Sequence, residues 1–134
     1  MPIRRLTKAD HPQSHGAFKP VGHVMVALRD EQTAGATAAA LLETGFEDED
    51  ILHYSAGEER AEMERMIDHA SDFAGFGYEI TLMRRYQTLA REGCSWLLVY
   101  APDEAHTRRV AEVARRHGAR LAVKYNRLVI EDLI

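Results

Sequence analysis

The sequence has little that would tie it to a membrane, a secreted fold or a thiol chemistry. Its 134 residues include one cysteine, Cys94, which cannot form a disulfide framework or a thiolate zinc site. No apolar run approaches the roughly 18 residues of a membrane span. Residues 1–20 lack the apolar stretch of a secretory signal. We therefore expect a cytoplasmic protein without a membrane partner.

Basic residues are fewer than acidic ones, and they are unevenly placed. The chain has 17 Lys and Arg and 21 Asp and Glu residues, and the net charge of −4 argues against a nucleic-acid partner. Residues 1–29 hold five bases and one acid, whereas residues 30–64 hold eleven acids and one base. This asymmetry suits self-association or binding of a basic partner, and solvated helix faces are the alternative interpretation.

The hydrophobic pattern predicts an N-terminal arm over residues 1–21 and a single α/β domain over residues 22–134. Within the domain, residues 56–93 form a helical insertion made of two helices. Predicted strands cover residues 23–28, 51–54, 96–100 and 121–125, and predicted helices cover residues 31–44, 78–92 and 104–117. A bulge or tight turn near Asn126 would explain the change of apolar phase that follows it.

An internal repeat organises these elements. A shift of 73 residues brings Asp30 onto Asp103 and Gly45 onto Gly118, so the predicted helix cap and stop recur. Both glycines should therefore adopt left-handed backbone. We expect an α+β ferredoxin-like sandwich of two βαβ halves, residues 24–54 superposing on 97–127, with the helical-pair insertion between them. The alternative is a doubly wound parallel α/β sheet.

Histidines are the first candidates for chemistry. His11 and His15 have the spacing of two ligands on a helix, but Pro12 between them argues against a helix and thus against a metal site. His53 in a strand and His69 in the insertion are interpreted as structural histidines. We therefore expect no bound metal.

The remaining motifs do not predict an enzyme. Cys94 has no local base to activate it, and residues 75–77, Gly-Phe-Gly, lack the lysine and strand-to-helix context of a phosphate loop. No nucleophile elbow or paired-carboxylate motif occurs. We expect no catalytic residue and no cofactor.

Aromatic and methionine side chains gather around the insertion. Such surfaces serve as cores, as subunit interfaces or as apolar ligand pockets, and all three interpretations stay open here. The candidate interface or pocket residues are Met63, Met66, Phe73, Phe76, Tyr78, Met83 and Tyr86.

Several short stretches are similar to a known family. They are Val24–Leu28, Asp30-Glu31, Thr44-Gly45-Phe46 and Asp48-Glu49-Asp50-Ile51, followed by Leu98-Val99-Tyr100 and Arg116-His117-Gly118-Ala119. Over residues 22–125 these sequence motifs resemble those of the small bacterial general-stress-protein domains of the heat-induced type. The resemblance implies a small α/β domain without an assigned catalytic residue.

Together these features predict a non-enzymatic domain that works by self-association, as a homodimer, or by binding a protein, in a stress-related setting. The alternative function is a small-molecule ligand sensor with its pocket between the sheet and the inserted helices.

Overall fold

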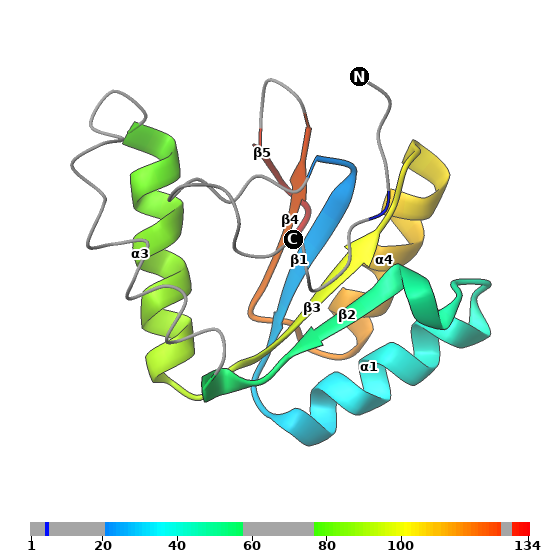
Figure 1. Cartoon of the computed structure of the whole chain (residues 1–134), viewed down its shortest axis with the longest axis horizontal. Coiled ribbons are helices and arrows are strands. Elements are labelled where there is room, and N and C mark those ends of the chain that lie inside the picture. The colour runs from blue at the N-terminus through cyan, green and yellow to red at the C-terminus, as the bar shows by residue number, and fades with distance from the viewer. Residues whose placement is uncertain (1–4, 6–20, 58–76, 127–129) are drawn as a thin grey trace.

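A computed structural model of the chain describes Arg5 and residues 21–57, 77–126 and 130–134 (Figure 1). In chain order the elements are β1 (His23–Leu28), α1 (Glu31–Glu43), the 3₁₀ helix η2 (Asp48–Asp50), β2 (Ile51–Tyr54), α3 (Gly77–Arg91), β3 (Ser95–Tyr100), α4 (Glu104–Arg116), β4 (Leu121–Tyr125) and β5 (Ile130–Asp132). Most of the predicted arm and the first insertion helix beyond residue 57 lie outside the described residues.

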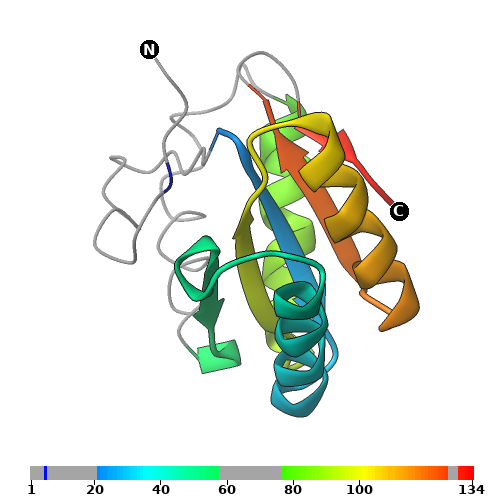
Figure 2. The same cartoon turned by 90° about the vertical axis from the view of Figure 1, so that its right-hand side faces the viewer.

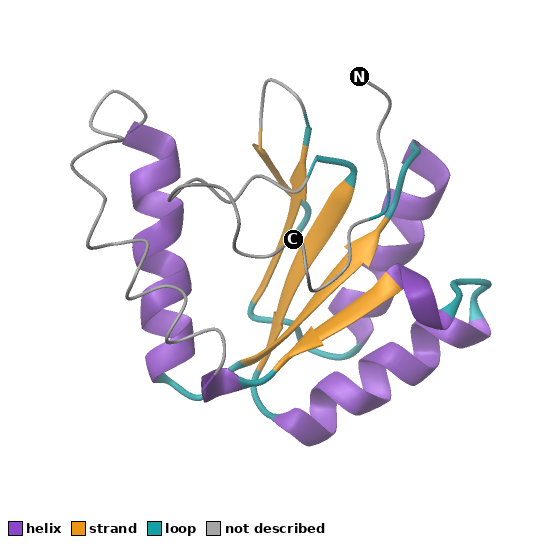
Figure 3. Ribbon diagram, viewed as in Figure 1, coloured by secondary structure: helices purple, strands orange, loops and turns teal. Residues whose placement is uncertain are grey.

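The strands form one antiparallel sheet in the order β2-β3-β1-β4-β5 (Figure 3). An α+β fold is therefore confirmed, and the alternative of a parallel doubly wound sheet is wrong. The sheet is antiparallel because of its crossovers. The connection through α1 skips one strand position, and so does the connection through α4. Each gap is filled by an antiparallel strand, and β1 and β3 pair from His23–Tyr100 to Leu28–Ser95.

Helices cover both faces of the sheet. Figure 2 places α1 and α4 on one face and α3 on the other. Alternate residues of β1 divide between two cores, because successive side chains of a strand point to opposite faces. Val24 and Val26 pack toward α1 and α4, whereas Met25 and Ala27 pack toward α3. The continuous apolar run of β1 thus reflects burial on two sides.

Helices α1 and α4 begin and end in the same way. Each has 13 residues and an aspartate cap, Asp30 Oδ1 accepting from Thr33 N at 2.7 Å and Asp103 Oδ1 from His106 N at 2.8 Å. Hydrogen bonding by Thr33, through its side chain and its backbone, lowers the pKa of the Asp30 carboxyl, and hydrogen bonding by His106, through its backbone and its side chain, lowers that of Asp103. The predicted left-handed glycines are confirmed, with φ of 105° at Gly45 and 67° at Gly118.

Two local features differ from the sequence-based expectation. Residues 47–50, between the first predicted helix and the second predicted strand, form η2 through a capping box between Glu47 and Asp50, an element that the hydrophobic pattern does not predict. The C-terminal strand β5 was not predicted; it pairs with β4 from Val123–Asp132 to Tyr125–Ile130. The bulge or tight turn expected near Asn126 stays a prediction, because residues 127–129 lie outside the described part of the chain.

Helix α3 agrees with the second predicted helix of the insertion. It buries Leu82, Tyr86 and Leu89 against the sheet. Tyr86, one of the candidate interface or pocket residues, is therefore used within the chain. None of the helices described is long and apolar enough to cross a bilayer.

Candidate functional site

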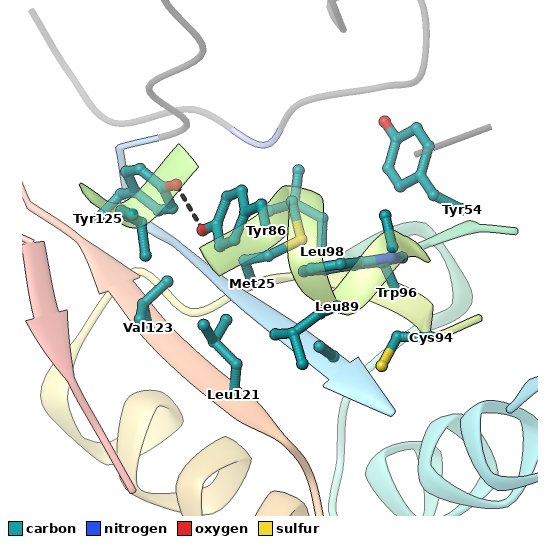
Figure 4. Close-up of a cluster of buried hydrophobic side chains, with 13 residues drawn as sticks. Met25, Tyr54, Tyr86, Leu89, Cys94, Trp96, Leu98, Leu121, Val123 and Tyr125 are labelled. Carbon is teal, nitrogen blue, oxygen red and sulfur yellow. Dashed lines mark hydrogen bonds between the residues drawn. The ribbon is translucent and has the colours of Figure 1, made fainter. Parts of the chain in front are cut away.

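Of the candidate interface or pocket residues, only Tyr86 has a described side chain. Tyr78 and Met83 lie in α3, and their side chains are not among the described ones. Outside the described residues are Met63, Met66, Phe73 and Phe76. Tyr86 is buried, with its ring edge-on to Trp96 at 5.2 Å and its hydroxyl 2.6 Å from that of Tyr125 (Figure 4). The Tyr86 side chain is therefore part of the hydrophobic core.

The core beneath α3 also holds the cysteine and the tryptophan. Cys94 is buried, and burial raises the pKa of its thiol, which disfavours the reactive thiolate. The indole Nε1 of Trp96 is buried without a hydrogen-bond partner among the described residues. A buried donor without an acceptor destabilises the folded state, and this one is a polar group in an otherwise apolar layer.

Glu31, His53 and Ser95 meet at the edge of the sheet with the residue types of a hydrolase triad. His53 Nε2 lies 2.6 Å from Glu31 Oε2 and 2.8 Å from Ser95 Oγ. Both contacts use the same ring nitrogen, whereas a triad histidine contacts its acid and its nucleophile through different nitrogens. Ser95 is fully buried. The cluster ties α1 to β2 and β3 and lacks an exposed nucleophile.

Lys124 on β4 is the most unusual polar residue of the described core. Its side chain is 7% exposed, and Nζ donates to Ala101 O and Thr107 Oγ1, each at 2.7 Å. Thr107 Oγ1 donates in turn to Asp103 O at 2.8 Å. Burial lowers the pKa of Lys124, and the negative charges of Glu131 and Asp103 partly oppose that shift. Lys124 is therefore held by neutral acceptors, not by a direct carboxylate.

An open groove of about 870 Å³ lies over this lysine, between α4 and the β4–β5 pair. Its lining carries more negative than positive groups. The acids are Asp103, Glu104, Glu112, Glu131 and Asp132, and the bases are Arg108, Arg115 and Lys124. Arg108 pairs with Glu104 and Arg115 donates to Leu133 O, so both arginines have partners. The groove is polar, acidic at its rim and lined by one buried amine.

Sequence reasoning did not find this site. The alternation of Leu121, Val123 and Tyr125 assigns Lys124 to the face opposite that apolar set. A charged residue on such a face is ordinarily solvated. Here α4 covers it, and the signal that could have indicated this is the buried neighbour on the same face, Ala122.

Two further charged surfaces lie at separate places on the molecule. The acidic turn, residues 47–50, binds an arginine: Arg5 Nη1 lies 3.0 Å from Asp50 Oδ1 and 4.0 Å from Glu47 Oε2. The arginine groove, about 450 Å³ in volume, lies along α3 and contains Arg84, Arg85 and Arg120, of which Arg120 pairs with Glu92 and Arg85 with Asp132.

Comparison with known proteins identifies no relative: no family model, no curated protein and no solved structure matches the chain. The similarity to general-stress-protein domains thus remains a prediction from the sequence. Among the described residues, no group of three or more His, Cys, Asp or Glu side chains is arranged to hold a metal ion.

Proposed function

We propose that the protein is a non-enzymatic, cytoplasmic domain that works by self-association into a homodimer. The fold proposed with it is a ferredoxin-like sandwich of two βαβ halves, in the stress-related role that the sequence resemblance implies. The strand order, the two skipped-strand crossovers and the paired caps at Asp30 and Asp103 support the fold.

One observation supports the proposed homodimer. The acidic turn binds Arg5, an arginine of the basic N-terminal segment. Asp48 and Glu49 of that turn are exposed. In Figure 1 the turn precedes β2 at the end of that strand remote from α3, whose arginine groove presents exposed Arg84 and Arg85. The two surfaces of one copy are therefore apart. Around a twofold axis, the turn of each copy would meet the groove of the other.

Charge reversal tests this arrangement. We expect Asp48→Lys/Glu49→Lys to be monomeric by light scattering at micromolar concentration, because its turn repels the arginine groove. Arg84→Glu/Arg85→Glu should also be monomeric for the converse reason. Mixed in equal amounts, the two variants should form a heterodimer, since each reversed surface then meets its complement.

The control is Arg108→Glu, which changes an arginine of α4 outside both surfaces and should leave the dimer intact. A wild-type mass that stays monomeric at every concentration contradicts the homodimer. Binding of a basic protein by that monomer would instead support the protein-partner form of the proposal. A wild-type dimer that both double variants preserve would place the interface elsewhere.

The second candidate function is the ligand sensor, and Trp96 favours it. Its indole Nε1, which has no hydrogen-bond partner among the described residues, lies in the layer between the sheet and α3, in the core that also holds Tyr86 and Tyr125. A small apolar molecule with one acceptor would satisfy that donor. Since Trp96 is the sole tryptophan, its emission should shift when such a ligand binds. A library of apolar acceptors that leaves both emission and melting temperature unchanged would argue against the sensor.

A further inference from the structure

We propose that Lys124 is an amine site that captures small, uncharged aldehydes as imines in the groove between α4 and the β4–β5 pair. This activity is independent of self-association. The groove belongs to the face of the sheet that carries α4, whereas the ligand pocket considered above would lie under α3.

The hydrogen-bond count around Lys124 fits the neutral amine. An ammonium group has three N–H donors, and a neutral amine has two together with a lone pair. The described residues offer Nζ two acceptors, Ala101 O and Thr107 Oγ1. The hydroxyl proton of Thr107 is given to Asp103 O, so this hydroxyl acts as an acceptor toward the lysine. The neutral amine is thus fully paired, and its lone pair remains for a reaction.

The surroundings favour the same form. Among the residues that the structure describes, no carboxylate oxygen is a hydrogen-bond partner of Nζ, and the residue is more than nine-tenths buried. Glu131, the cross-strand partner of Lys124, and Asp103 are the acidic groups whose charge acts on it. A buried lysine held by neutral acceptors has a lower pKa than a solvated or ion-paired one, so more of it is in the neutral form.

The reaction needs only the aldehyde. The lone pair of Nζ forms a C–N bond to the carbonyl carbon while the carbonyl π pair moves to oxygen. Both amine protons and that oxygen leave as one water molecule, and the C=N bond closes. When the imine takes up a proton from solvent it carries one N–H, which can donate to Ala101 O or to Thr107 Oγ1.

The charge of the groove selects the class of aldehyde. Five carboxylates and two arginines line it besides Lys124, and both arginines already have partners. A carbonyl compound that carries its own carboxylate, such as a 2-oxo acid, is repelled by the acidic rim. A short uncharged aldehyde is not. Its volume is a small fraction of the groove's approximately 870 Å³.

The chain is well suited to a direct test because it has only three lysines, Lys8, Lys19 and Lys124. The full-length protein is treated at neutral pH with propionaldehyde and cyanoborohydride, which reduces each imine to a stable secondary amine. Peptide mass spectrometry then gives the rate at each lysine. We expect Lys124 to be alkylated about tenfold faster than either of the others, because the lowered pKa of the buried amine leaves more of it in the neutral, reactive form.

Two variants and a second probe refine the test. Glu131→Gln removes a charge that favours the ammonium, so alkylation of Lys124 should rise about two- to fivefold. Glu112→Gln changes another groove carboxylate that does not act on the lysine and should have no effect. Glyoxylate, an aldehyde that carries a carboxylate, should show a smaller preference for Lys124 over Lys8 and Lys19 than propionaldehyde does, because the groove is acidic. Alkylation of Lys124 at or below the rate of Lys8 and Lys19 overturns the proposal, as does a Glu131→Gln rate equal to that of wild type.

Discussion

Replacing Trp96 by alanine is expected to lower the free energy of unfolding by about 3–5 kcal/mol. The side chain is fully buried and is the largest in the described core. It packs edge-on against Tyr86 of α3, so the substitution opens a cavity where the helix meets the sheet. Urea denaturation followed by circular dichroism measures the loss, because the variant has no tryptophan fluorescence.

Trp96→Phe is the matched control, because it keeps a ring in contact with Tyr86. Phenylalanine also removes the indole Nε1, whose unpaired burial costs about 1–3 kcal/mol and therefore offsets part of the lost volume. We expect Trp96→Phe to retain most of the wild-type stability. Equal losses in the two variants would mean that the indole nitrogen is stabilising in the folded chain.

The central elements could be predicted because their local signals agree with their surroundings. The apolar run of β1 is buried on both faces, and the aspartate and glycine signals at Asp30, Gly45, Asp103 and Gly118 mark real helix ends. Such signals act within one helix or strand, so one sequence is enough to find them. The antiparallel sheet could be predicted because the two βαβ segments were treated as equivalent.

The edge of the sheet could not be predicted in the same way. Strand β5 has three residues, two of them acidic, and no apolar alternation identifies so short a segment. It is held by its pairing with β4 and by Leu133, which packs on the core beneath α4. Acidic residues on a short edge strand also discourage pairing with another chain.

The groove over Lys124 was missed for a related reason. Its acceptors, Ala101 O and Thr107 Oγ1, lie 23 and 17 residues earlier in the chain. Only the crossover through α4 brings them to β4. Local sequence reasoning finds lysines by charge and assigns them to solvent, and the apolar neighbour Ala122 on the same face is too weak a signal to reverse that assignment.

Replacing Lys124 by methionine is expected to reveal the lowered pKa as a dependence of stability on pH. Burial makes the folded chain bind the lysine proton more weakly than the unfolded chain does. Between the two pKa values the unfolded chain therefore holds more protons, and the contribution of Lys124 to the free energy of unfolding rises with pH. Methionine lacks this titration and leaves Ala101 O and Thr107 Oγ1 without their donor.

The stability of wild type minus that of Lys124→Met should thus be smallest near neutrality and grow toward about pH 10, reaching about 1–3 kcal/mol per acceptor left unpaired. Urea titrations at several pH values measure it, and ionisation of the buried tyrosines cancels because both proteins share it. Thr107→Val is the control: it removes one acceptor but keeps the lysine, so it should retain the pH dependence of wild type. A difference that shrinks as the pH rises would mean that the fold favours the ammonium. That result would contradict both the burial argument and the hydrogen-bond count on which the amine site rests.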